Sequence, residues 1–269
     1  MDRRSFLKNS ALGGTAAAAT SLAAPAYAQG NRTLTLVTTW GRGLAGVHDA
    51  AQRAADTITA MSGGSLTIDL KAAGELDGAF EVFDAVTSGQ ADMYHGADYY
   101  FVGQHPGYAF FTSVPFGMTP IEIMNWYYQG EGQAFLDELG SIFGLKSFLA
   151  GNTGPQAGGW FAKEIAGPED FQGLKFRMPG LGGQALASGA IDGTERIGPW
   201  ADEKAGFQEI TKFYYTAGMH EPGAALSLAT NLDVWDSLSP EHQKIVEIAS
   251  AEAHQWNLTQ FMNNTGAAL

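Results

Sequence analysis

The 269-residue sequence contains no cysteine. Disulfide bonds, cysteine-ligated metals and a thiol nucleophile are therefore excluded, and stability must come from a packed core. Basic residues are also few: 15 lysines and arginines stand against 28 aspartates and glutamates, which gives a formal net charge of −13. Such an acidic surface repels phosphate backbones and anionic lipids, which argues against nucleic acids and membrane surfaces as partners. An anionic ligand would need a local cluster of positive charge.

The sequence also lacks long apolar runs. After residue 28 no stretch of about 20 residues is both apolar and uncharged, so we expect no insertion into a membrane. The first residues follow the order of an export signal, with Arg3 and Arg4, then a run rich in Ala and Gly, then Ala26-Tyr27-Ala28. We predict a twin-arginine signal peptide over residues 1–28 and a mature protein in the periplasm. Cleavage would change the net charge from −13 to −15, because three basic residues and one acidic residue are lost.

Strand-like and helix-like patterns alternate after the predicted signal. The patterns predict strands over 33–40, 65–76 and 90–96, and helices over 46–64, 78–89 and 120–139. This order favours α/β packing in which neighbouring strands are parallel. Strand patterns resume from residue 145.

A short internal similarity suggests that the fold has two related lobes. The stretches "AVTSGQAD" (85–92) and "ALASGAID" (185–192) share Ala, an aliphatic residue, Ser-Gly and a final Asp at the same spacing. Two α/β lobes would enclose a cleft in which a ligand binds and which closes by hinge bending. We assign the first lobe mainly to 29–150, the second lobe and cleft mainly to 151–222, and a crossover with a C-terminal helical part to 223–269.

Motifs of catalysis are missing from the sequence. The six histidines show no HExxH spacing, and there is no G-x-S-x-G, no G-x-G-x-x-G after a strand and no phosphate-binding loop with its lysine. We therefore predict that the protein is not an enzyme and uses no catalytic cofactor. An exported enzyme with a prefolded cofactor, acting on a small carboxylate, stays as the alternative, because the twin-arginine route often exports such proteins.

Polar side chains in glycine-bracketed segments are the best candidates for a site. In "GLKFRMPG" (173–180), alternation places Leu174 and Phe176 on one face and Arg177 on the other. The remaining candidates come from the segments 151–160, 192–200 and 218–223: Asn152, Gln156, Glu195, Arg196 and Glu221. Such a set resembles a site in which a guanidinium fork holds a small carboxylate beside a carboxylate-lined place for a cation. Exposed loops with ordinary charges are the alternative interpretation.

An aromatic segment over 99–118 divides into two groups. Tyr99 and Tyr100 combine apolar rings with hydroxyl groups, so we expect them to line the cleft from the first lobe. Phe101 could line the cleft wall with them, whereas three later phenylalanines of this segment are expected in the core, as aromatic runs usually fill the space between sheet and helix: Phe110, Phe111 and Phe116.

Longer motifs resemble the solute-binding proteins of TRAP transporters, in the subgroup that binds 2-oxo acids such as pyruvate. The motifs run in family order: "AGEL" (73–76), "DAVTSGQADM" (84–93), "YYFVGQHPGYA" (99–109), "VPFGM" (114–118), "GNTGPQAGGWF" (151–161), "GLKFRMPGLGG" (173–183), "ALASGAIDGTERIGPWADEKAGF" (185–207) and "YYTAGMHEPG" (214–223). The resemblance implies a periplasmic receptor with two α/β lobes and a ligand cleft between them. Such a receptor closes on a small organic acid and delivers it to membrane subunits, and some members form a homodimer.

The resemblance also implies roles for individual residues. Arg177 matches the arginine that grips the ligand carboxylate. A sodium or calcium ion that bridges to the ligand is surrounded in the subgroup by residues that match Gln156, Glu195 and Glu221. The residues that fall near this pocket are Asn152, Tyr99 and Tyr100.

Three departures from the family pattern stand out. Arg196 occupies a position where the subgroup usually has tryptophan, so it brings a second cation beside Arg177 that meets a second carboxylate or points to solvent. After Gln184 the chain lacks a segment that in relatives forms a helix and a strand, and such a loss would leave unpaired backbone groups and an opened core. The chain also ends at Leu269, before the long C-terminal helices that are typical of the family.

Overall fold

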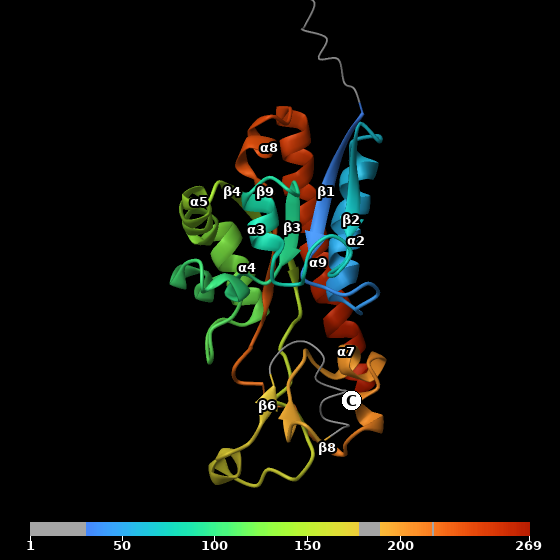
Figure 1. The fold of residues 1–269 in the computed structure, drawn as a ribbon, viewed down its shortest axis with the longest axis vertical. Helices are drawn as coiled ribbons and strands as arrows, with labels where there is room; N and C mark the ends of the chain where they lie inside the picture. The colour runs from blue at the N-terminus through green and yellow to red at the C-terminus, as the bar shows by residue number, and fades with distance from the viewer. Residues whose placement is uncertain (1–30, 178–188, 217) are drawn as a thin grey trace, which may run out of the picture.

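The computed structural model describes residues 31–177, 189–216 and 218–269. The predicted signal peptide and the junction after Gln184 lie outside these ranges. Two separate sheets form the framework, and the carboxyl ends of the parallel strands of the first sheet point toward the second (Figure 1).

The first sheet has five strands in the order β2-β1-β3-β9-β4. Its strands are β1 (Arg32–Thr38), β2 (Leu66–Lys71), β3 (Met93–Gly96), β4 (Leu145–Asn152) and β9 (Ala225–Asn231). Strand β1 pairs in parallel with β2 and β3, and β9 runs antiparallel between β3 and β4. The predicted α/β order with parallel neighbours is therefore confirmed for the first three strands.

Helices cover both faces of this sheet. They are α2 (Val47–Met61), α3 (Val82–Thr87), α4 (Pro120–Gln129), α5 (Gly132–Ile142), α8 (Leu232–Asp236) and α9 (Pro240–Ala268), with short 3-10 turns η1 (Asp98–Phe101) and η2 (Pro106–Phe110). The helix predicted over 120–139 is two helices, because Gly130 has extended backbone angles (φ −97°, ψ −153°) and ends α4. Thr119 and Glu122 form a capping box that fixes where α4 begins.

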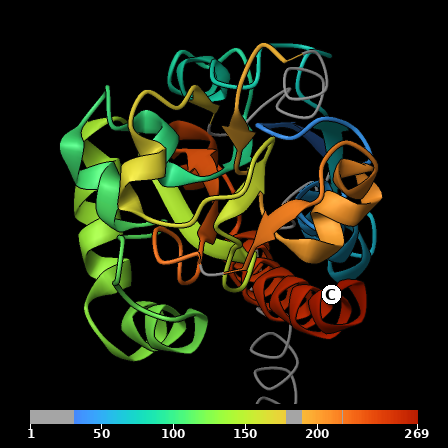
Figure 2. The same ribbon diagram turned by 90° about the horizontal axis from the view of Figure 1, so that it is seen from below.

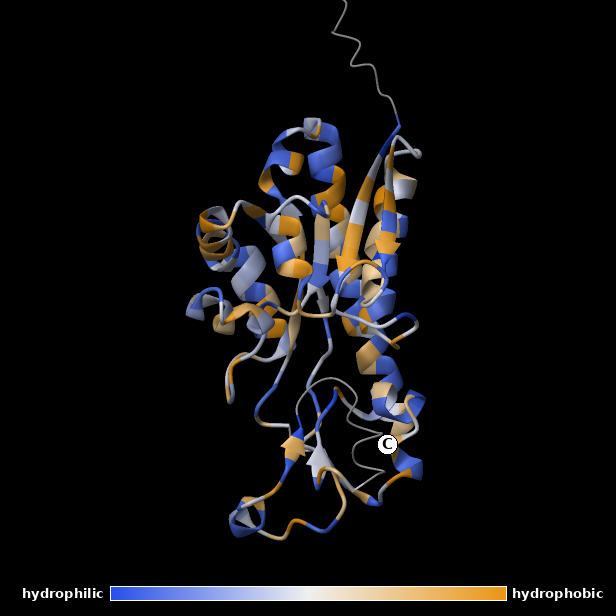
Figure 3. Ribbon diagram, in the orientation of Figure 1, coloured by the Kyte–Doolittle hydropathy of each residue, from blue (hydrophilic) through white to orange (hydrophobic). Residues whose placement is uncertain are grey.

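Two apolar clusters fill the space between the helices and the first sheet. The cluster beneath α3, α4 and α5 is rich in aromatic side chains, and the one beneath α2 and α9 is mostly aliphatic. Figure 3 shows hydrophobic residues along β1 and β2, where these clusters meet the sheet. The prediction that Phe111 belongs to the core is confirmed, since it is 5% exposed. The same prediction was wrong for Phe110 and Phe116, which are 60% and 80% exposed, because an aromatic run does not specify which face of a short turn each ring takes.

The second sheet is small, with four strands in the order β6-β7-β5-β8. Its strands are β5 (Gly159–Phe161), β6 (Phe176–Arg177), β7 (Gly193–Thr194) and β8 (Phe213–Tyr215), and the turns η3 (Pro168–Phe171) and η4 (Phe207–Glu209) and helix α7 (Pro199–Lys204) accompany them. One face packs Trp160 against Phe207 and Tyr214. The other face borders a cavity of about 760 Å³ that Phe161 and Phe176 line.

Two crossing segments and one long helix connect the sheets. Residues 153–158 leave β4 and residues 218–224 lead into β9, and the two segments are hydrogen-bonded to each other from Thr153 N–H to Ala224 O (3.0 Å) and from Gln156 N–H to Glu221 O (3.0 Å). Helix α9 packs on β4 and α2 and reaches α7 at its far end, as Figures 1 and 2 show. In the described residues no helix combines the length and apolar character that a membrane span requires.

Candidate functional site

Arg177 stands at the end of β6, beside Thr194 of β7. Its neighbour Phe176 stacks on Phe161 at a centroid distance of 5.3 Å, as expected for the packed face of this strand, whereas Met178 lies outside the described residues. Arg177 Nη1 donates to the backbone carbonyl of Glu195 (3.4 Å), whereas Nη2 is buried without a partner among the described residues. Burial lowers the pKa of this guanidinium, although arginine stays charged at neutral pH. The site therefore contains a fixed cation with unused hydrogen-bonding capacity.

Glu195 lies beside this cation, and Glu221 is a second buried glutamate whose preceding residue, His220, approaches Glu195. Glu195 is 1% exposed, its N–H donates to Arg177 O (3.1 Å), and its Oε1 lies 4.0 Å from His220 Nε2. Glu221 is 6% exposed, and burial together with the nearby negative charge of Glu195 raises its pKa to about 8. Glu195 Oε1 and Glu221 Oε2 are both buried and have no hydrogen-bond partner in the described part of the chain. The pair carries a repulsion that a bound cation would relieve.

Gln156 and Asn152 lie on the first crossing segment and at the end of β4. The Gln156 N–H donates to Glu221 O (3.0 Å), which holds the two crossing segments together at the site, and its Nε2 donates to Thr153 Oγ1 (3.1 Å). Asn152 is fully buried, and its Oδ1 accepts from Gly154 N–H (2.8 Å). Its Nδ2 is a buried donor with no partner in the residues described.

Tyr99 and Tyr100 approach the site from the first sheet. They belong to η1, which begins two residues after the end of β3, and their rings meet edge to face at 4.8 Å. Burial raises the pKa of both phenols, and the negative charges of Glu221 and Glu195 contribute in the same direction. The charges of the two glutamates therefore act on both phenols.

The guanidinium of Arg196 contacts other residues of the second lobe. Its Nη1 donates to Ala201 O (2.5 Å) and lies 3.9 Å from Asp202 Oδ1, and its guanidinium lies over the ring of Phe207 at 5.9 Å. Asp202 also accepts from Trp160 Nε1 (2.8 Å), and burial raises its pKa to about 6. The carboxylate that Arg196 meets is thus one of the protein's own. Nothing in the sequence singled out Asp202, because an acid in the first turn of a short helix usually faces solvent.

The oxygen atoms of the site fit a hard cation. The described residues contain no group of three His, Cys, Asp or Glu side chains placed to hold a metal. The predicted set offers two carboxylates, Glu195 and Glu221, with the amide of Gln156. Sodium and calcium prefer such oxygen ligands, and two of these oxygens are buried and unpartnered.

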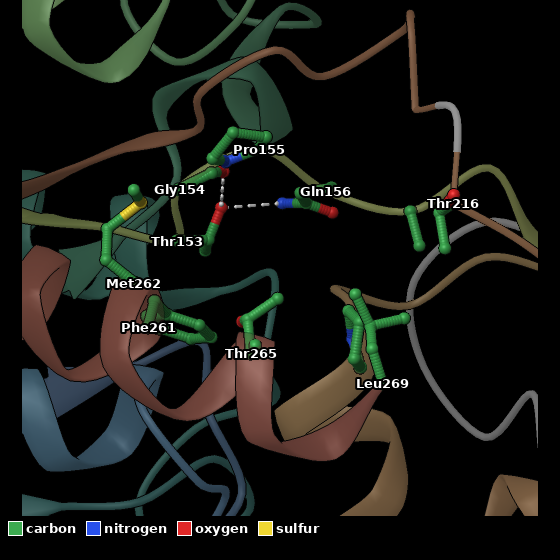
Figure 4. A pocket seen from close by; sticks show the side chains of 12 residues that line it. Thr153, Gly154, Pro155, Gln156, Thr216, Phe261, Met262, Thr265 and Leu269 are labelled. Atoms are coloured by element: carbon green, nitrogen blue, oxygen red, sulfur yellow. Dashed lines mark hydrogen bonds between the residues drawn. The ribbon is translucent and has the colours of Figure 1, made fainter.

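A separate cavity lies behind the crossing segment. It has a volume of about 260 Å³, and Gln156 is the one predicted site residue in its lining. Figure 4 shows Thr153, Gly154, Pro155 and Gln156 on one side of this cavity and the last turns of α9 on the other. Arg177 and the two glutamates do not line it, so the cavity is distinct from the cation and carboxylate cluster.

Comparison with known proteins decides the family. Residues 44–184 and 183–268 match the family described as bacterial extracellular solute-binding protein, family 7 (DctP). The chain belongs to this family. The two matched segments meet beside Gln184, where the sequence comparison places the missing segment.

Similar proteins include TRAP receptors with bound ligands. The monocarboxylate 2-oxoacid-binding periplasmic protein of Nostoc sp. (strain PCC 7120) is 39% identical, over 87% of this chain and 69% of that protein. A TRAP periplasmic solute-binding protein from Pseudoalteromonas atlantica T6c, with bound sodium and pyruvate, has a TM-score of 0.83 and 37% identity, and covers 89% of this chain and 78% of its own. One from Colwellia psychrerythraea, with bound calcium and pyruvate, has the same TM-score and coverage at 36% identity. The predicted two-lobed α/β binding-protein fold is confirmed.

Proposed function

We propose that the protein is the periplasmic receptor of a TRAP transporter, which captures a small 2-oxo or 2-hydroxy monocarboxylate with a sodium or calcium ion. After export by the twin-arginine route it would deliver this acid to the membrane subunits. The observation that carries the proposal is the half-buried guanidinium of Arg177, whose Nη2 is buried without a partner among the described residues while Nη1 donates to the carbonyl of Glu195. The relatives described above, two of which hold pyruvate with a metal ion, support it.

Each side chain has a defined part in this proposal. Arg177 donates to the ligand carboxylate, which is the strong bidentate geometry of a guanidinium. Glu195, Glu221 and Gln156 would hold the cation, whose charge offsets the glutamates and attracts the ligand's oxygens. Tyr99 and Tyr100 would form the first-lobe wall, and Asn152 would supply amide donors. Arg196 was also predicted to bind the ligand. Because its guanidinium already contacts Asp202, it has the weakest support among the predicted ligand residues.

Thermal unfolding of the purified protein tests the proposal. Pyruvate, 2-oxobutyrate, lactate and C4 dicarboxylates are each added with sodium, with calcium or with a chelator. A ligand at a hundredfold excess over its dissociation constant should stabilise the fold by about 2.7 kcal/mol. Arg177→Ala should lose this shift, whereas Lys175→Ala, which removes an exposed cation two residues away, should keep it. A full shift in Arg177→Ala would reject the assigned site.

The alternative function is an exported enzyme acting on the same acids. Proton NMR of protein incubated with each acid distinguishes the two, because a receptor leaves the acid unchanged. Conversion of the acid at a rate proportional to protein concentration would favour the enzyme.

A further inference from the structure

Closure of the two lobes requires a ligand that contacts both of them. A ligand shifts an open and closed equilibrium only by its difference in affinity for the two states. Arg177 belongs to the second sheet and Glu195 directly follows its strand β7, and Gln156 and Glu221 lie on the crossing segments. A contact on the first sheet must therefore accompany them, and Tyr99 and Tyr100 are so far its candidates.

The first sheet offers a second place for such a contact. Strand β1 lies between β2 and β3, and all three are parallel. The next strand of the chain after β1 is β2, on one side of the β1–β3 pair, whereas the next after β3 is β4, on the other side. Ligands of open α/β sheets bind at the carboxyl ends of strands where this reversal occurs. These ends point toward the second sheet (Figure 1).

Thr39 occupies this place. It directly follows β1, and its N–H donates to His95 O of β3 (3.2 Å), which extends the pairing of the two strands by one residue. A Cβ atom at Gly96, the last residue of β3, would lie 2.9 Å from Thr39 Cγ2. The Thr39 side chain therefore lies across the glycine at the end of the neighbouring strand.

The hydroxyl of Thr39 has no partner within the protein. Thr39 is 8% exposed, and its Oγ1 is buried without a hydrogen bond to any described residue. Thr38, one position earlier, uses its hydroxyl to donate to Trp40 O (3.0 Å). An unpaired buried hydroxyl costs free energy, and such groups call for an explanation. Arg177 Nη2 is likewise buried and has no hydrogen-bond partner among the described residues.

Neighbouring contacts fix the position of Thr39. The indole of Trp40 donates from Nε1 to His95 Nδ1 (2.8 Å), and its ring meets Tyr100 edge to face at 6.2 Å. Burial lowers the pKa of His95 to about 4, so this ring is neutral at pH 7 and its Nδ1 accepts. The turn after β1 is thereby attached both to β3 and to the tyrosine wall of the site.

We propose that Thr39 is a ligand-binding residue of the first lobe, whose hydroxyl donates a hydrogen bond to an oxygen of the 2-oxo acid head group. The inference rests on the proposed function and adds a first-lobe contact to it. A hydroxyl suits this place because it can donate to an oxygen without adding a charge beside Arg177 and the two glutamates. Thr39 would thus favour the closed form and select oxygen-bearing head groups.

Isothermal titration with pyruvate in the presence of calcium tests this role, with unfolding temperature as a second measurement. Thr39→Val keeps the shape and removes the hydroxyl, so it should weaken binding by about tenfold to a hundredfold, as expected for a hydrogen bond to a charged group. Its unfolding temperature without ligand should not fall, because the hydroxyl has no protein partner to lose. Thr39→Ser keeps the hydroxyl and should bind within about threefold of wild type.

Thr230→Val is the matched control. Thr230 is fully buried and its hydroxyl is also unpartnered among the described residues, but it pairs with Met93 at the start of β3, the opposite end of the sheet. Its affinity should equal that of wild type. Equal affinity in Thr39→Val, or a loss shared by Thr230→Val, would overturn the inference while leaving the Arg177 assignment intact. Failure of wild type to bind any of the acids would remove the proposed function and this inference together.

Discussion

At the scale of single residues, the protein buries several ionisable groups that the ligand site does not use. Asp98 is fully buried in the first lobe, where Ser227 donates to its Oδ2 and its Oδ1 has no partner among the residues described. Burial raises the pKa of this carboxyl to about 7. The fold therefore prefers Asp98 in its protonated form.

This preference makes stability depend on pH. A carboxyl whose pKa is raised by folding stabilises the fold fully below its unfolded pKa, near 3.9, and this stabilisation is lost as pH rises through about 7. The loss amounts to about 4 kcal/mol at most. Asp98→Asn should therefore unfold at a higher temperature than wild type at pH 8, with a smaller difference at pH 5. Asp236→Asn, at an exposed position, is the control, and a difference that is the same at both pH values would contradict the prediction.

The sequence identified individual site residues only where local pattern carried the information. Alternation around Arg177 predicted which side of β6 packs, and the stacking of Phe176 on Phe161 confirms it. The partner of Arg196 could not be found in this way, because Asp202 meets it through the packing of α7 on the second sheet. Thr39 carries no motif either, since an unpaired hydroxyl becomes visible only when its surroundings are known.

At the scale of elements, the two crossing segments determine how the lobes meet. Gly218 lies against the first crossing segment so closely that a Cβ atom there would clash with Gln156 O. Gly218→Ala should separate the segments and lower the unfolding free energy by about 1–3 kcal/mol, as overpacking does. The same substitution should also lower the affinity for the ligand, because Gln156 and Glu221 are hydrogen-bonded to each other at this point.

Gly103→Ala is the control for this prediction. No heavy atom lies within 4 Å of a Cβ atom at Gly103, so the methyl group should change stability little. Chemical denaturation of both variants, with calorimetric titration of ligand, provides the measurement. Equal unfolding free energies of the two variants would contradict the prediction, because the crossing segments would then accommodate the methyl group without loss of stability.

Helices and strands could be predicted from sequence where the hydrophobic periodicity agreed with the residues that bound the segment. The strands at 33–40, 65–76 and 90–96 correspond to β1, β2 and β3, and the helices at 46–64 and 78–89 to α2 and α3. The expected single helix over 120–139 failed because the apolar pattern continues across Gly130, where the backbone becomes extended. The pairing of β9 between β3 and β4 is a long-range contact that no local pattern encodes.

At the scale of the whole molecule, an acidic protein holds two adjacent buried glutamates. Burial and the charge of Glu195 raise the pKa of Glu221, so the pair destabilises the fold when both are ionised. Calcium should therefore raise the unfolding temperature of wild type, and a chelator should reverse the increase. In chelator, Glu221→Gln should unfold at a temperature at least as high as that of wild type. Calcium should no longer raise its unfolding temperature.

Glu164→Gln removes an exposed charge in the second lobe and serves as the control. It should keep the full calcium increment, because an exposed carboxylate contributes little to stability. Differential scanning calorimetry with and without calcium is the measurement. An undiminished increment in Glu221→Gln would place the cation elsewhere.

One feature of the connection between the sheets bears on how the protein can be engineered. Asn152 at the end of β4 and Ala225 at the start of β9 are register partners, so the chain departs from and returns to one rung of an antiparallel ladder. The second lobe is in this sense the oversized loop of a β-hairpin. Replacing residues 153–224 by a two-residue turn would close that hairpin and yield a miniature first lobe.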